Sequence, residues 1–138
     1  MKTMRSWLTA LVLTLAVLAP LWFSGTPQAL AAGTFTPLTL QNGWTGGAFG
    51  TSSPAVRTIS GIVHLKGGIA TTGTNPVPFT LPTAFRPASV VFVPVDLCNA
   101  TNGRLQIEPT GVVTVEAEGG TFSNAACFTS LDGASFAP

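Results

Sequence analysis

The segment "VRTISGIVHLKGGIA", residues 56–70, decides the fold of this chain. Apolar residues alternate there with polar or small ones, which is the two-residue period of a β-strand with one face in a core. The face that carries His64 and Lys66 is mostly polar, so we expect solvent on that side. Apart from Arg57 at its start, the other face is expected to be buried and consists of Ile59, Gly61, Val63, Leu65, Gly67 and Ile69.

Three further segments predict strands. In "VPFTL", residues 77–81, the alternate residues Val77, Phe79 and Leu81 are expected to point inward. "SVVFVPVD", residues 89–96, is apolar on both faces and predicts a strand covered on both sides, while Pro94 cannot donate to a ladder and indicates a strand end or edge. "GRLQIEPTGVVTVEAE", residues 103–118, predicts a hairpin that turns at 109–111.

The spacing of turn residues predicts the fold class. Two short strands are expected around Asp132-Gly133, and turn residues elsewhere suit roughly seven or eight short strands, with almost no helix pattern. We therefore predict an all-β fold, a single small antiparallel β-sandwich similar to a jelly roll. Two glycine-rich segments, 46–54 and 67–76, are expected to be loops, and loops at one end of a sandwich often carry binding sites.

The first 32 residues have the three parts of a secretory signal. Lys2 and Arg5 precede an apolar stretch, 7–23, and "SGTPQALAA", residues 24–32, ends in the small residues that a signal peptidase reads. An uncleaved membrane anchor is the alternative, because the apolar stretch approaches the ~20 residues that span a bilayer. Pro20 and the small-residue end favour cleavage. We expect a signal peptide, 1–32, and a domain, 33–138, that is secreted or periplasmic and leaves the membrane after cleavage.

The charge balance argues against nucleic acid as a partner. Six basic and five acidic residues are present, and two of the basic ones, Lys2 and Arg5, lie in the predicted signal. The remaining four basic residues against five acidic ones give the domain a net charge of −1. Proteins that bind nucleic acid use a basic face to release counterions, which this composition does not predict.

Cys98 and Cys127 are the only two cysteines, and an exported protein meets conditions in which a disulfide persists. We predict that they form a structural disulfide. A redox pair is the alternative, but such pairs usually lie close in sequence as C-x-x-C.

An ordered series of short motifs covers nearly all of residues 33–138. The motifs are Asn42-Gly43-Trp44, Val63-His64-Leu65-Lys66-Gly67, Leu81-Pro82-Thr83-Ala84-Phe85-Arg86-Pro87, Pro109-Thr110-Gly111 and Leu131-Asp132-Gly133-Ala134-Ser135-Phe136. Together they resemble the C-terminal receptor-binding (head) modules of bacteriophage tail-fibre proteins and related stand-alone bacterial domains. The resemblance implies a β-sandwich head, often a homotrimer, that binds a host surface glycan without catalysis. The chain differs from that pattern in its predicted secretion signal, its cysteine pair and its lack of a fibre shaft.

Four residues are candidate ligand-binding groups: Trp44, His64, Lys66 and Arg86. Trp44 lies beside "TGGAFG" and is either an aromatic platform for a sugar or a core residue. Arg86 lies in a connector stiffened by the proline after it, where it either binds ligand or acts as a structural post, bonded to carbonyls or to a carboxylate such as Asp132.

Catalytic and metal sites find weaker support, and we expect no enzyme, no metal and no cofactor. His64 is the only histidine, so a triad would need it together with a serine such as Ser60 and an acid such as Asp96. Glu116 and Glu118 are about 7 Å apart on one strand face, which two glycosidase carboxylates could match. Asp96, Asn99 and Asn102 offer oxygen atoms to calcium, but such residues are also ordinary in turns.

Two functions remain as expectations. The first is a secreted, non-enzymatic binding module for a cell-surface or cell-wall glycan, which uses loops near Trp44 and the face of His64 and Lys66. The second is a structural domain that self-associates or packs in a larger exported or phage-tail-like complex.

Overall fold

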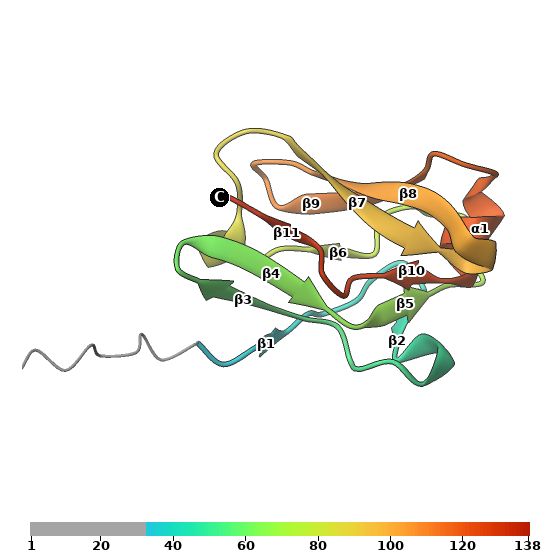
Figure 1. The fold of residues 1–138 in the computed structure, drawn as a ribbon, viewed down its shortest axis with the longest axis horizontal. Helices are drawn as coiled ribbons and strands as arrows, with labels where there is room; N and C mark the ends of the chain where they lie inside the picture. The colour runs from blue at the N-terminus through green and yellow to red at the C-terminus, as the bar shows by residue number, and fades with distance from the viewer. Residues whose placement is uncertain (1–32) are drawn as a thin grey trace, which may run out of the picture.

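The computed structural model describes residues 33–138, so the expected signal peptide lies outside the described residues. Two antiparallel sheets pack against each other, and in Figure 1 β3 and β4 of the smaller sheet lie below β7, β8 and β9 of the larger one. The four-stranded sheet has the order β1-β3-β4-β11, and the seven-stranded sheet has the order β2-β5-β10-β7-β8-β9-β6. The predicted all-β sandwich is confirmed. Within 33–138, no helix is long and apolar enough to cross a membrane.

The strands are short, apart from those of one hairpin and one three-stranded meander. The four-stranded sheet contains β1 Thr36–Pro37, β3 Ala55–Ile59, β4 Ile62–Lys66 and β11 Ser135–Phe136. The seven-stranded sheet contains β2 Thr45–Gly46, β5 Gly68–Ala70, β6 Phe79–Thr80, β7 Val91–Leu97, β8 Thr101–Ile107, β9 Val112–Ala117 and β10 Thr129–Ser130. The helical segments are η1 Ala48–Gly50, η2 Thr83–Phe85, η3 Cys98–Ala100 and α1 Phe122–Cys127.

The segment 57–69 is three strands, so the prediction of one continuous strand is wrong. Ser60 (φ 49°) and Gly61 (φ 81°) both have left-handed backbones and form a two-residue turn between β3 and β4. Such a turn matches the twist of an antiparallel pair and closes a hairpin. Because the chain reverses there, Arg57 pairs with His64 on the outer face. Val63, Leu65 and Ile69 are buried as predicted, whereas Ile59 is only half-buried and Gly61 is exposed, because the reversal places them on the outer face and in the turn.

Gly67 is the point at which the chain leaves the four-stranded sheet and enters the seven-stranded one. Its φ is 99°, and a Cβ built there would lie 2.6 Å from the Ser52 carbonyl oxygen. The Gly67 N–H donates to Asp132 Oδ1 at 2.8 Å, and the Gly67 carbonyl accepts from the Leu131 N–H at 2.7 Å. Leu131 and Asp132 link β10 to β11, where the chain passes back to the smaller sheet. The two crossings between sheets are therefore bonded side by side.

The meander β7-β8-β9 supplies much of the core. The predicted hairpin is confirmed: the Gly111 N–H donates to the Glu108 carbonyl, and the inward residues are all almost completely buried, namely Leu105, Ile107, Val113 and Val115. The prediction that β7 is covered on both sides is wrong, because Phe92 on its outer face is 54% exposed. Pro94 lies at an edge as predicted: β8 pairs along the whole of β7, whereas β10 pairs with it at Leu97.

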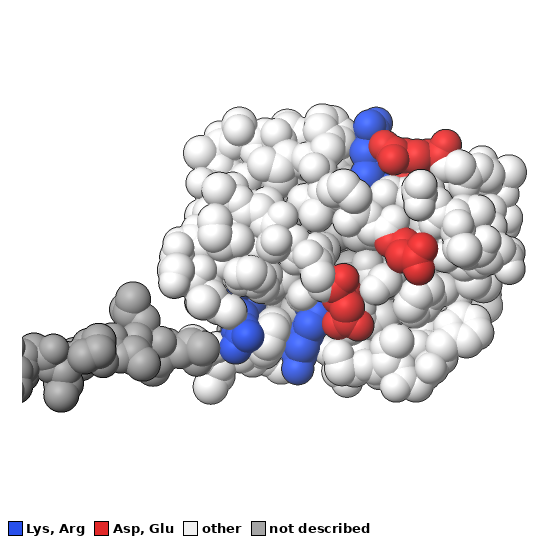
Figure 2. Space-filling view, viewed as in Figure 1, with Lys and Arg blue, Asp and Glu red and all other residues white. Residues whose placement is uncertain are grey.

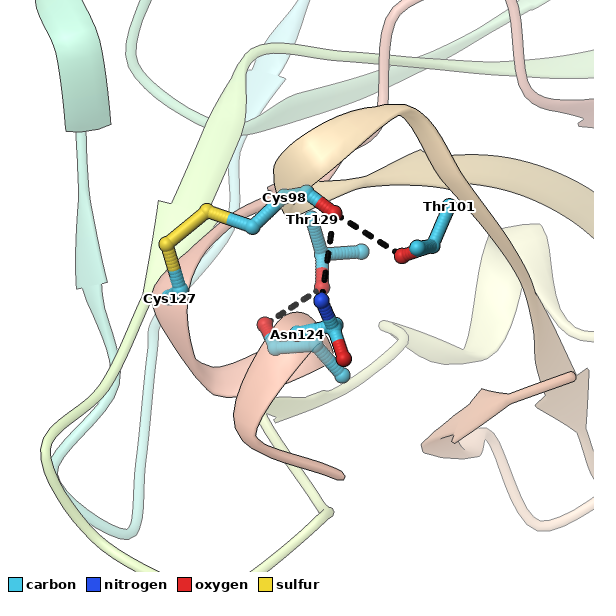
Figure 3. Close-up of a disulfide and its surroundings, with 6 residues drawn as sticks. Cys98, Thr101, Asn124, Cys127 and Thr129 are labelled. Carbon is cyan, nitrogen blue, oxygen red and sulfur yellow. Dashed lines mark hydrogen bonds between the residues drawn. A yellow bond between two sulfur atoms is a disulfide. The ribbon is translucent and has the colours of Figure 1, made fainter. Parts of the chain in front are cut away.

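Helix α1 was not expected from the sequence. Its six residues are too few to show a helical period, although Thr121 and Asn124 are spaced as in a capping box, and the Thr121 N–H donates to Asn124 Oδ1. The predicted disulfide between Cys98 and Cys127 is confirmed and joins the end of α1 to η3 (Figure 3). Thr101 Oγ1 and Asn124 Nδ2 both donate to the Cys98 carbonyl, so hydrogen bonds reinforce the same connection.

Replacement of Gly67 by alanine should destabilise the fold by about 3 kcal/mol, because left-handed strain adds to a clash with the Ser52 carbonyl. Gly61→Ala is the matched control, since Gly61 has a similar φ of 81° but open space around its Cβ position. That control should cost only about 1 kcal/mol. Urea unfolding of both variants measures the difference, and equal losses would show that the crossing is not sterically constrained.

Loss of the disulfide should lower the free energy of unfolding by roughly 3 to 4 kcal/mol, because the bridge closes a loop of 29 residues in the unfolded chain. A Cys98→Ala/Cys127→Ala double variant, unfolded in urea beside the oxidised protein, provides the measurement. The variant's stability should not change when reductant is added, whereas that of the parent protein should fall.

Candidate functional site

The outer face of the four-stranded sheet brings together four side chains that point away from the core. Arg57 on β3 pairs with His64 on β4, and His64 pairs with Ser135 on β11. Since Thr36 pairs with Val56, the antiparallel register places Phe35 beside Arg57 at the other end of this row. Lys66, two residues after His64, lies on the same side of β4. We call Phe35, Arg57, His64 and Lys66 the basic face.

Phe35 holds both cations of the basic face. The Arg57 Cζ atom lies 4.3 Å from the centroid of the Phe35 ring, and the Lys66 Nζ atom lies 4.5 Å from it. A cation near the face of an aromatic ring is attracted by the ring quadrupole. Lys66 pairs across the strands with Ala55, whose small side chain leaves room for the lysine to reach the ring. The geometry fixes two flexible side chains in one place.

The two cations of the basic face form no ion pair with the rest of the described chain. Within residues 33–138, neither Arg57 nor Lys66 forms an ion pair, and Arg57 Nε is buried without a hydrogen-bond partner. Figure 2 shows sparse charges, with two basic groups over the region of β1 and β3 and a carboxylate beside one of them. Asp132 is bonded next to Lys66, because its Oδ1 accepts the Gly67 N–H.

Arg104 on the other sheet is the opposite case. Its Nε lies 2.6 Å from Glu116 Oε2, and its Nη1 lies 3.3 Å from Glu118 Oε1. The hydrogen bond to Glu116 and the charges of both glutamates raise the pKa of Arg104. The Arg104 Cζ atom also lies 4.6 Å from the centroid of the exposed Phe92 ring. This guanidinium therefore has its carboxylate partners within the protein.

Trp44 lies in the core and does not offer a platform for a sugar. Its exposed fraction is 4%, its ring meets Phe122 edge to face, and its Nε1–H donates to the Asn75 carbonyl at 2.8 Å. A buried ring with a satisfied N–H has almost no surface left for a ligand. The burial of Trp44 favours the alternative, a core residue, over a ligand-binding group.

Arg86 is bonded within the connector before β7, as expected of a structural post. Its Nε–H donates to the Leu81 carbonyl at 2.9 Å, and a Cβ on Gly111 would lie 2.5 Å from the same Nε. The side chain therefore packs between its own connector and the turn of the β8–β9 hairpin. The suggested bond to Asp132 is not formed: Arg86 donates to the Leu81 carbonyl, and Asp132 Oδ1 accepts the Gly67 N–H.

A pocket of about 320 Å³ lies between the loops at the end of the sandwich that carries the disulfide. It is lined by small and hydroxyl-bearing residues, namely Gly43, Thr45, Ala70, Thr71, Thr72, Ala126 and Cys127. Two of its hydroxyl groups already donate within the protein, Thr45 to the Ala70 carbonyl and Thr71 to the Gly43 carbonyl. The pocket is neutral and is separate from the basic face.

The groups considered for catalysis are held apart or already engaged. His64 lies on the outer face of the four-stranded sheet, whereas Asp96 belongs to β7 of the other sheet. Glu116 and Glu118 share one partner, Arg104. In the part of the chain that the structure describes, no group of three or more His, Cys, Asp or Glu residues could hold a metal ion.

Of the four sequence candidates, the structure brings His64 and Lys66 together and separates Trp44 and Arg86 from them. Sequence reasoning missed Phe35 and Arg57 as members of the same face. The signal was Ser60-Gly61, a dipeptide typical of a two-residue hairpin turn, which places Arg57 opposite His64. No family model, curated protein or solved structure matches this chain. The resemblance to tail-fibre head modules therefore stays a prediction from the motifs.

Replacement of Arg86 by leucine should lower the free energy of unfolding by about 1 to 2 kcal/mol, because the Leu81 carbonyl loses its donor. Arg104→Leu is the matched control and should change stability little, since an exposed ion pair contributes little. Thermal and urea unfolding of both variants compare the two arginines. If Arg86→Leu unfolds like the parent protein, Arg86 is not a post.

Proposed function

We propose that this protein is an exported, non-enzymatic binding module that recognises a cell-surface or cell-wall glycan through its basic face. The observation that carries the proposal is the clustering of His64 and Lys66 with Arg57 and Phe35 on an outward sheet surface. Such a surface suits an extended polymer better than a small, enclosed substrate. The resemblance of the motifs to receptor-binding heads leads to the same proposal.

The chemistry of the basic face favours recognition. Arg57, His64 and Lys66 all carry N–H groups, which can donate to the hydroxyl, ring and acidic oxygens of a saccharide. The ring of Phe35 restrains two of them before any ligand arrives, so less conformational entropy is lost on binding. Neither a nucleophile paired with a base nor a metal is needed for this role.

Export is part of the proposal because it explains the disulfide. Cysteine bridges persist in oxidising compartments and are rare in the cytosol. The Cys98–Cys127 bridge, together with the signal predicted over 1–32, supports a secreted or periplasmic protein.

Self-association is the second candidate function, and the other sheet favours it. Phe92 on β7 is 54% exposed, and Val90, just before β7, is 45% exposed. One edge of β7 is open, because β10 pairs with it only at Leu97. Exposed apolar groups near an unpaired edge are typical of an interface. A trimer like that of the resembling heads, or packing in a larger exported complex, would bury this region.

Binding to polysaccharides and intact cell walls should be saturable and should weaken about tenfold or more in a His64→Ala/Lys66→Ala variant, because donors to the ligand are lost. Phe92→Thr is the control on the other sheet and should bind as the parent protein does. A glycan array and a pull-down with the purified, oxidised protein measure this.

Native mass of the same samples separates the two functions. Absence of binding to every glycan, combined with an oligomer that dissociates in Phe92→Thr, would replace the proposed function by assembly. If the native mass of His64→Ala/Lys66→Ala and of Phe92→Thr equals that of the parent protein, assembly gains no support and the glycan array decides the proposed function.

A further inference from the structure

Two positive charges are held close together on the basic face. Because Arg57 Cζ and Lys66 Nζ lie 4.3 Å and 4.5 Å from one ring centroid, at most about 9 Å separates them, which is comparable to the Debye length of about 8 Å at physiological ionic strength. Their repulsion is therefore only partly screened. Phe35 attracts each cation but cancels neither charge.

Charge is also divided between the two sheets. The strands of the four-stranded sheet contain Arg57, His64 and Lys66 and no acidic residue. Four of the five acidic residues, Asp96, Glu108, Glu116 and Glu118, belong to the β7–β8–β9 region of the other sheet, and two of them hold Arg104. The fifth, Asp132, lies in the link before β11 and is bonded to the Gly67 N–H, next to Lys66. The two cations of the basic face thus have one carboxylate near them and keep an excess of positive charge.

We infer that the glycan recognised at the basic face is anionic, and that its acidic oxygens pair with Arg57 and Lys66. The inference rests on the proposed function and adds the class of ligand. Carboxylate, phosphate and sulfate groups share the required chemistry: oxygen atoms that accept charge-assisted hydrogen bonds from a guanidinium or an ammonium group. The acidic oxygens of the ligand pair with Arg57 and Lys66 as the carboxylates of Glu116 and Glu118 pair with Arg104.

The face also has an apolar end, which suits a saccharide rather than a bare ion. Ile59 and Ile62 pair beside the Ser60-Gly61 turn on the same side as Arg57 and His64, and Ile62 is partly exposed. The C–H face of a sugar ring can pack on such residues while its acidic group reaches the cations. Nucleic acid is disfavoured because the domain has a net charge of −1 and few cations in all.

The decisive comparison is between dextran and dextran sulfate, which share a backbone and differ in charge. The oxidised protein should bind dextran sulfate at least tenfold more tightly than dextran, and the binding should weaken as salt is raised. Polygalacturonate and a phosphate-bearing wall polymer are added to identify the acidic group. Binding to any one of the three anionic polymers supports the inference.

Matched variants locate the site. Arg57→Gln and Lys66→Gln should each weaken binding to the anionic polymer by about tenfold, whereas Arg57→Lys, which keeps the charge, should retain most of it. Arg104→Gln removes an arginine that is already paired with glutamates and should leave the affinity unchanged. Melting curves of all four variants confirm that each is folded. If Arg104→Gln loses as much affinity for the anionic polymer as Arg57→Gln does, the assignment of the site is overturned.

The outcomes distinguish the two proposals. Equal binding to dextran and dextran sulfate would overturn the anionic class but retain glycan binding. No binding to any polysaccharide would overturn both. Binding to double-stranded DNA as tight as to the anionic polymers, and lost in Arg57→Gln, would make the partner a nucleic acid and overturn the inference.

Discussion

The hydrogen bonds between Gly67 and the Leu131-Asp132 link are the constraint on which the rest of the structure depends. Gly67 carries the chain from β4 into β5, and Leu131-Asp132 carries it from β10 back to β11. Because the two crossings are bonded to each other, each sheet receives strands from both halves of the chain. The Ser52 carbonyl lies against the same point, so a side chain there would be strained.

This junction also places β11 beside the basic face. It places β11 beside β4, which puts Ser135 next to His64, while the Ser60-Gly61 turn puts Arg57 on the other side of the same histidine. Phe35 then completes the row from the start of β1. The basic face therefore combines the start of β1 with the β3–β4 hairpin, and it exists only because strand pairing fixes their register.

The sequence predicts the parts of this fold that depend on local pattern. The alternation in 103–118 gives the β8–β9 hairpin and its inward residues, and the spacing and context of the cysteines give the disulfide. Where one pattern continues through a turn or a crossing, as at Ser60-Gly61 and Gly67, alternation alone cannot show that the chain reverses or changes sheet. Phe92 was misassigned for a related reason, since an apolar residue on an outer face looks the same in sequence as one in a core.

The candidate site was predictable only in part, because its members are distant in sequence and are joined by pairing. His64 and Lys66 could be recognised from one strand, whereas Phe35 and Arg57 required the three-dimensional register. The alternation of inward and outward side chains along β4 has an evolutionary consequence. Val63 and Leu65 of β4 hold the core while His64 and Lys66 face outward, so substitutions at the outward positions can change the recognised surface without repacking the interior. If the proposed function holds, a lineage that meets new ligands can diversify this face while its sandwich stays the same.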